Sequence, residues 1–138
     1  MTNQRPKIAV GALVFNKEGK LFLGKCDSKW DGKWIVPGGH VEWGETIHDA
    51  MVRELKEETD LDATSCEYFW LQECIFPKEF HKEMHFIFPC FICKVDSTDV
   101  TLNDEFDGHT WVTLDEALNM DVNASSKKFI KEYIRRKK

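Results

Sequence analysis

Hydrophobic residues gather in short runs along the chain, with polar segments between them. The runs KIAVGALVF and LFLGKC, at residues 7–15 and 21–26, flank the turn-forming segment NKEGK and predict two neighbouring strands. Later apolar runs of strand length predict further strands at residues 66–76, 84–95 and 111–113. By contrast, residues 28–45 are rich in glycine and tryptophan and predict a loop.

A helical periodicity begins at Thr46. Its hydroxyl stands three residues before Asp49, which is the spacing of a helix N-cap, and the helix is expected to end near Thr59. At 100° per residue, one face of this helix carries the predicted core stripe, which consists of Met51, Val52, Leu55 and Thr59. Residues 114–120 and the last dozen residues predict two more helices, the second of them amphipathic.

Strands and helices alternate irregularly along the chain. This order predicts an α/β protein of the α+β type, in which a mixed sheet lies between helices packed on both of its faces. No repeat and no linker rich in proline, glycine or serine divides the chain. We therefore expect one domain over residues 1–138.

Charge and composition narrow the class of protein. The net charge of −5 disfavours binding to duplex nucleic acid. No apolar run approaches the roughly 20 residues that span a bilayer, and the first residues lack the order of a signal peptide. We therefore expect a cytoplasmic protein that binds neither membranes nor duplex nucleic acid.

The five cysteines favour the same compartment, because an odd number argues for reduced thiols rather than a disulfide framework. Cys90 and Cys93 have the spacing of half a zinc site. In a strand, however, side chains three positions apart point to opposite faces and cannot bind the same metal ion. Buried structural thiols are thus the favoured interpretation.

Three glutamates, Glu54, Glu57 and Glu58, share a face of the first predicted helix beside its core stripe. Alone, such a run is typical of a solvated face, where like charges cost only about 0.2–0.5 kcal/mol per pair. Next to the core the effective dielectric is lower and the repulsion larger, so a divalent cation would turn this cost into binding free energy. Carboxylate oxygens are ligands that Mg²⁺ prefers. The face is therefore a candidate Mg²⁺ site.

The wider segment GHVEWGETIHDAMVRELKEETDL, residues 39–61, resembles the signature of the Nudix hydrolases, G-x5-E-x7-R-E-U-x-E-E-x-G-U, where U is an aliphatic residue. Background composition gives such a match on the order of once in a hundred million starts. The strand pair before this box, the segment WIVPGG at its mouth and the late WV followed by a helix extend the likeness over most of the chain. The matching residues are Gly39, Glu45, Arg53, Glu54, Leu55, Glu57, Glu58 and Leu61.

One position departs from the signature, because Asp60 stands where the family has its second glycine. That glycine follows the helix, where a left-handed backbone is usual. Asp is one of the few other residues that adopt this conformation readily. The departure therefore bears on local stability and removes no ligand.

The resemblance implies a Nudix-like α/β/α sandwich that hydrolyses a nucleoside diphosphate linked to another group. The resemblance to MutT-like members favours hydrolysis of nucleoside triphosphates to a nucleoside monophosphate and diphosphate, by a monomer or homodimer. The alternatives are hydrolysis of ADP-ribose or a dinucleoside polyphosphate and, in a different class, a non-catalytic module that senses nucleotides. Loss of box glutamates would mark such a module, and this chain keeps all of them.

The resemblance also assigns the metal ligands. It implies that Mg²⁺, or Mn²⁺ in its place, is held by Glu57 and Glu58, with the carbonyl of Gly38 completing the shell. Glu54 is either a further ligand or the base that activates water. The metal would neutralise the negative phosphate oxygens and lower the pKa of the attacking water, and a glutamate would deprotonate this water.

Three further roles follow from the resemblance. Arg53 and Glu45 would orient the metal-binding carboxylates. An acidic residue from a later loop often completes the site in the family, and Glu105 resembles that residue. Asp104 and Asp107 are the fallback choices for the same role.

Contacts with the substrate are less defined by the sequence. Gly39, at the mouth of the box, is a candidate contact. Lys25, at the end of LFLGK, is either a phosphate partner or a solvated lysine at a strand end. Asn123 stands where MutT-like members have an asparagine that faces the purine, but it also stands where an N-cap of the last helix is expected.

Overall fold

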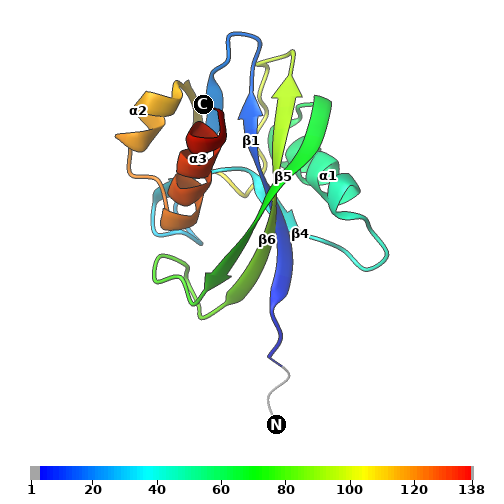
Figure 1. Ribbon diagram of the computed structural model, residues 1–138, viewed down its shortest axis with the longest axis vertical. Coiled ribbons are helices and arrows are strands. Elements are labelled where there is room, and N and C mark those ends of the chain that lie inside the picture. The colour runs from blue at the N-terminus through cyan, green and yellow to red at the C-terminus, as the bar shows by residue number, and fades with distance from the viewer. Residues whose placement is uncertain (1–3, 138) are drawn as a thin grey trace.

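The computed structural model describes residues 4–137, which form a seven-stranded sheet with helices on both faces (Figure 1). The strands are β1 (Lys7–Phe15), β2 (Leu21–Cys26), β3 (Lys33–Ile35), β4 (Gly38–His40), β5 (Ala63–Ile75), β6 (His85–Val95) and β7 (Gly108–Val112). The helices are α1 (Ile47–Thr59), α2 (Leu114–Leu118) and α3 (Ala124–Lys137).

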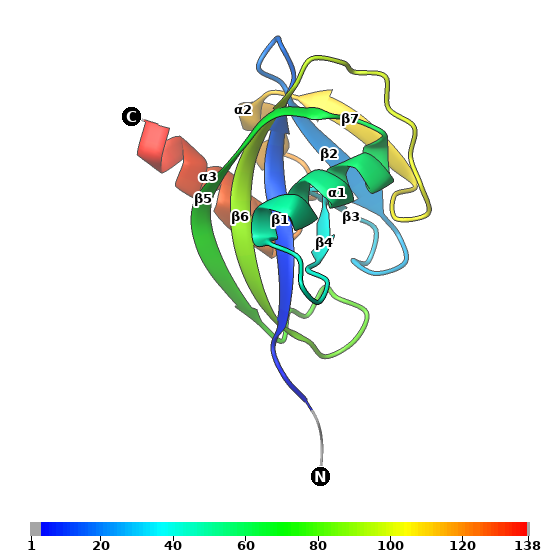
Figure 2. The same cartoon turned by 90° about the vertical axis from the view of Figure 1, so that its right-hand side faces the viewer.

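Strand β1 lies in the middle of the sheet. The main strand order is β3-β2-β1-β6-β5, and β4 and β7 pair with β1 and β2. β1 and β6 run parallel, whereas the other pairs are antiparallel, so the sheet is mixed as predicted. Figure 2 shows α1 in front of the central strands and α3 behind the sheet. The predicted sandwich of helices around a mixed sheet is confirmed.

Each face of the sheet has its own hydrophobic cluster. Ala12 and Val14 of β1 point into the cluster that also holds Met51 and Leu55 of α1. Leu13, between them, points into the cluster that contains residues of α2 and α3. Because helices cover both faces, neither face of β1 needs polar residues over this stretch. This explains the unbroken apolar run that predicts the strand.

The expectation of a loop over residues 28–45 was wrong at two places, because β3 and β4 lie within it. Each has only three residues, and β4 has the sequence GGH, which carries no strand signal. Their conformation is imposed by pairing, since β3 adds to β2 and β4 adds to β1. Elsewhere the predicted elements exist, with β5, β7 and α3 each beginning three residues earlier than expected.

Helix α1 has the ends that its sequence predicts. Thr46 accepts a hydrogen bond from Asp49 N at 3.0 Å. Asp60 adopts a left-handed conformation with φ of 63°, and its N–H donates to the Lys56 carbonyl at 2.9 Å. The missing glycine of the signature is therefore tolerated as expected.

The predicted core stripe was wrong at one residue. Val52 is 36% exposed, whereas Ala50 and Glu58 are buried. The helix is thus turned so that its glutamate-bearing side packs toward β4. The two glycines of β4 make this close approach possible, as described below.

The two cysteines of the CFIC segment lie on opposite faces of the sheet, as predicted. Cys90 belongs to the cluster under α3, and Cys93 belongs to the cluster under α1. Among residues 4–137, no helix combines the length and apolar character that crossing a bilayer requires.

Candidate active site

A cavity of about 190 Å³ connects the box helix with the far side of the sheet. Seven residues form what we call its carboxylate side: Lys29, Gly38, Gly39, His40, Glu54, Glu58 and Glu105. Residues from β5, β6 and the start of α3 form what we call its amide side: Gln72, Phe88, Cys90, Asn123, Ser125, Ser126 and Phe129. One cavity therefore joins ionisable groups to neutral polar and aromatic groups.

Two adjacent glycines bring the box helix against the sheet. A Cβ added to Gly38 would overlap the carbonyl of Val10 on β1, and a Cβ added to Gly39 would overlap the carboxylate of Glu54. At Gly38 the obstacle is backbone, so only a residue without a side chain fits there, whereas a side chain at Gly39 would displace the carboxylate of Glu54. The glycines thus allow Glu54 and Glu58 to lie directly over β4.

Burial raises the pKa of both of these glutamates. Glu58 is 3% exposed and accepts a hydrogen bond from Gly38 N at 3.0 Å. Burial, reinforced by the charges of Glu54 and Glu105, raises its pKa well above the ordinary value. Burial likewise raises the pKa of Glu54 to about 7, with the charges of Glu57 and Glu105 adding to the effect of burial and Arg53 opposing it. In the metal-free protein, these carboxyls hold protons far more tightly than exposed ones.

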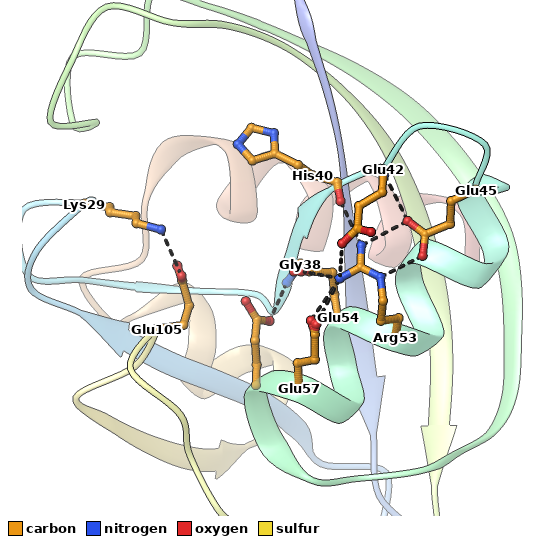
Figure 3. Close-up of polar contacts among 10 residues, drawn as sticks. Lys29, Gly38, His40, Glu42, Glu45, Arg53, Glu54, Glu57 and Glu105 are labelled. Atoms are coloured by element: carbon orange, nitrogen blue, oxygen red, sulfur yellow. Dashed lines mark hydrogen bonds and ion pairs between the residues drawn. The ribbon is translucent and has the colours of Figure 1, made fainter.

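Arg53 joins most of the remaining carboxylates of the box (Figure 3). Its Nε and Nη2 donate to the two oxygens of Glu45 at 2.7 and 3.0 Å. Its Nη1 donates to both oxygens of Glu57 at 3.0 Å, and Nη2 also donates to the carbonyl of His40. The hydrogen bonds from Arg53 lower the pKa of Glu45 to about 2. The guanidinium therefore fixes the position of Glu57 relative to β4, which is the geometry expected of an orienting residue.

Glu105 comes to the cavity from the loop between β6 and β7. Its carboxylate accepts from Lys29 Nζ at 3.1 Å, and it lies near enough to Glu54 and Glu58 to raise the pKa of both (Figure 3). The fallback acids do not reach the site. Asp104 is exposed, and Asp107 accepts from the backbone N–H of Asp27 at 2.8 Å.

Of the two interpretations of Lys25, the structure favours a solvated lysine at a strand end. Lys25 pairs with Asp27 at 3.3 Å and is not among the residues that line the cavity. Lys29, four residues later, lines the cavity beside Glu105. The segment that follows β2 turns back toward the box helix, and this turn decides which lysine faces the site. A lysine in a loop carries no periodicity that could have identified it.

The amide side contains two buried carboxamides. Asn123 is 2% exposed, and its Oδ1 accepts from Ser126 N at 3.0 Å, so its predicted role as an N-cap is confirmed. Gln72 is 7% exposed, and its Nε2 donates to the carbonyl of Ser125 at 3.1 Å. These backbone partners fix the orientation of both amides. Within residues 4–137, Asn123 Nδ2 and Gln72 Oε1 are then left as a donor and an acceptor beside the cavity.

Sequence reasoning missed Gln72 altogether. Its only signal is a polar side chain inside the apolar run of residues 66–76. Strand alternation cannot tell whether such a residue faces water or a cavity.

The carboxylate side has the donor chemistry of a magnesium site. Its oxygens come from carboxylates and a backbone carbonyl, which Mg²⁺ prefers. The raised pKa values of Glu54 and Glu58 reflect burial first and neighbouring like charges second, and a bound cation would offset both. Among residues 4–137, no three acidic, histidine or cysteine side chains are positioned to hold one ion. Glu57 instead faces Arg53, Glu58 faces Gly38 N, and Glu105 faces Lys29. Side-chain rotations would therefore accompany metal binding.

Comparisons with known proteins agree with this architecture. A family model described as the NUDIX domain matches residues 5–133. The chain is 28% identical over 135 residues to the nucleoside triphosphatase NudI of Escherichia coli O81, covering 92% of this chain and 96% of NudI.

Two solved structures share the fold. MutT from Methanosarcina mazei Go1 has a TM-score of 0.80 at 24% identity, covering 100% of this chain and 99% of MutT. The NUDIX domain of Shewanella oneidensis NrtR, solved with ADP ribose, has a TM-score of 0.82 at 16% identity, covering 98% and 90% of the two chains. Because the family model spans nearly the whole chain and the box lies over the cavity, this protein belongs to the NUDIX family and is a Nudix hydrolase.

Proposed function

We propose that this protein is a Mg²⁺-dependent pyrophosphohydrolase that converts nucleoside triphosphates to nucleoside monophosphates and diphosphate. The observation that carries the proposal is the cavity with two unlike sides. The carboxylate side suits a metal-bound triphosphate, and the amide side suits a nucleobase. A nucleotide has the same polarity, with charge at one end and a flat, hydrogen-bonding ring at the other.

The phosphate end would use the box residues. Glu57 and Glu58 would hold Mg²⁺, or Mn²⁺ in its place, with Gly38 O, Glu54 and Glu105 as further candidate ligands. When bound, the metal would neutralise the phosphate oxygens and lower the pKa of water. Lys29 already lies beside Glu105 and can meet a phosphate oxygen there. Gly39 offers close backbone approach, since it has no side chain.

Proton transfer is assigned to Glu54. Its pKa of about 7 in the metal-free protein suits a group that takes a proton near neutral pH. Arg53 lies 3.6 Å from its Oε2 while holding Glu57 and Glu45, so the arginine keeps the whole set aligned. Glu105 is the alternative for this role, because it lines the same side of the cavity.

The base end would use Asn123 Nδ2 as donor and Gln72 Oε1 as acceptor. Every nucleobase presents a hydrogen-bond acceptor next to a donor along part of its edge, which complements this pair. The rings of Phe88 and Phe129 line the same side of the cavity. These aromatic faces suit contact with a base.

Similarity favours triphosphates over the other substrate classes. NudI, which is similar over almost its full length, is a nucleoside triphosphatase. The likeness to the ADP ribose complex of NrtR rests on the fold, so ADP-ribose and dinucleoside polyphosphates remain the alternative substrates. All the carboxylates of the box are present, which argues for an enzyme rather than a nucleotide sensor.

The proposal places a monomeric or homodimeric enzyme in the cytoplasm, with a small nucleotide as its partner. The five cysteines are all free thiols, as a reducing compartment would keep them.

A panel of nucleoside triphosphates and diphosphates, ADP-ribose and dinucleoside polyphosphates, each assayed with Mg²⁺ and scored by products, tests the proposal. We expect monophosphate and diphosphate from triphosphates as the fastest reaction. Faster release of AMP and ribose phosphate from ADP-ribose would replace the proposed substrate class. Full activity in excess chelator would overturn the metal-dependent mechanism itself.

A further inference from the structure

Two thiols face each other on neighbouring strands, away from the cavity. Cys66 of β5 and Cys93 of β6 are direct partners in the antiparallel register. Their sulfur atoms lie 3.1 Å apart, and the Cys93 thiol donates a hydrogen bond to Cys66 Sγ. Neither cysteine lines the cavity, so the nucleotide site makes no use of them.

Their place in the register is compatible with a disulfide. Directly opposed residues on antiparallel strands have Cα atoms about 4.5–5.5 Å apart, which lies within the range found for disulfides. A sulfur–sulfur bond of about 2 Å requires the two atoms to approach by only about 1 Å more. Side-chain rotation can supply such a movement without unpairing the strands.

The surroundings give the two thiols different reactivity. Cys93 is fully buried in the cluster that also contains Leu55 and Leu61, beneath α1. Cys66 is partly exposed, so it is the thiol that a reagent from solvent meets. The hydrogen bond from Cys93 lowers the pKa of Cys66, and the same bond, together with burial, raises the pKa of Cys93. Cys66 is therefore the accessible nucleophile, and Cys93 is its buried partner.

We propose that Cys66 and Cys93 form a reversible thiol–disulfide modification site that reacts with small disulfides of the glutathione disulfide class. Cys66, as a thiolate, attacks one sulfur of the oxidant, forms a mixed disulfide and releases one thiolate, which takes up the proton that Cys66 lost. Cys93 then attacks Cys66 Sγ and breaks the mixed disulfide, and its proton passes to the second leaving thiolate. The two cysteines lose two electrons in total, and one glutathione disulfide becomes two glutathione molecules.

The other cysteines provide internal controls. Cys74 lies on the same strand and is also partly exposed, but its partner in the register is Phe86. A small disulfide can therefore add to Cys74 without a thiol across the strand to displace it. Cys26 and Cys90 are buried. Burial raises the pKa of Cys90 to about 12, which keeps it unreactive.

The bond would act on the scaffold rather than on the cavity. It would tie β5 to β6 beneath α1 and close the loop between residues 66 and 93. Cross-linking the chain across this loop restricts the unfolded state, so the oxidised protein should unfold at a temperature a few degrees higher.

Mass spectrometry of the full-length protein tests the site independently of the proposed function. Reduced protein is incubated with excess glutathione disulfide, the remaining thiols are alkylated under denaturing conditions, and peptides are mapped without reduction. We expect a Cys66–Cys93 disulfide in the wild type and in Cys74→Ser. In Cys93→Ser, we expect the glutathione adduct on Cys66 to persist, because nothing displaces it.

Thermal unfolding of Cys74→Ser supplies a second readout. The oxidised form should melt a few degrees above the reduced form, dithiothreitol should remove the difference, and Cys93→Ser should show no such rise. Wild-type protein that keeps both thiols free, or that accumulates glutathione on Cys66, overturns the proposal. A glutathione adduct on Cys74 together with free Cys66 and Cys93 would overturn the proposal as well. Such a result would show that the oxidant is active but does not react with Cys66 and Cys93.

Discussion

The two sides of the cavity differ in charge, because one is lined by ionisable glutamates and the other by neutral carboxamides. The carboxylate side gathers glutamates whose burial and mutual repulsion raise the pKa of Glu54 and Glu58. The amide side contains neutral carboxamides, Gln72 and Asn123, each of which is held by backbone groups. The first arrangement is costly until a cation binds, whereas the second is stable alone and offers only directed hydrogen bonds. Changes on the first side should therefore alter catalysis, and changes on the second should alter which nucleotide binds.

Glu58→Gln should have the largest effect. The amide keeps the shape of the side chain but removes a charged metal ligand, so turnover should fall by about a hundredfold or more. The melting temperature of the metal-free protein should stay level or rise, because one repelling charge is lost. Activity assays and thermal unfolding in chelator measure the two effects. A fully active variant would show that the ligand set is misassigned.

Glu105→Gln tests the same side from the loop that faces the box helix. It should lower kcat by about tenfold, and more than it raises KM, because the lost interaction is made mainly in the transition state. Asp104→Asn is the matched control and should have little effect, since Asp104 is exposed and outside the cavity. Equal, small effects of both changes would leave Glu105 as an ordinary loop acid.

Gln72→Leu tests the amide side and should have a smaller effect of a different kind. Losing the acceptor beside the cavity should raise KM by roughly fivefold for the preferred triphosphate, with kcat little changed, because a ground-state contact with the base is removed. The ranking of triphosphates by kcat/KM should change as well. A uniform loss of kcat for all substrates would contradict a role in base recognition.

The melting temperature of the metal-free protein should shift modestly with pH. The carboxylate side of the cavity should contribute to this shift, whereas the amide side should not. Glu54, with a pKa of about 7, and Glu58 bind protons more tightly in the folded state than at their ordinary value of 4.5. Through Glu54, the metal-free protein should therefore lose stability as the pH rises from about 4.5 to about 7, and Glu58 should add to this loss in the same direction. Glu45 acts in the opposite sense, because its pKa of about 2 means that stability is lost as the pH falls below about 4.5.

Melting curves in chelator across this range measure the shift. Glu54→Gln should flatten the decline between about pH 4.5 and 7, whereas Gln72→Leu should leave the decline unchanged. A metal-free wild type that gains stability steadily toward pH 7 would contradict the raised pKa values.

The sequence by itself determined most of the framework. The apolar runs of β1, β2 and β6, the capped helix α1 and the spacing of the box glutamates are local patterns, and local physics is enough to predict them. The left-handed Asp60 was predicted for the same reason, because helix termination depends on the residues at the end.

Only the tertiary structure decided which residues surround the cavity. Lys29 rather than Lys25, the buried Gln72, the strand made of GGH and the exposed Val52 all depend on how segments distant in the chain pack together. The facing thiols of Cys66 and Cys93 depend on a register between two strands. Periodicity assigns a residue to a face of its own element, but it contains no information about which other element covers that face.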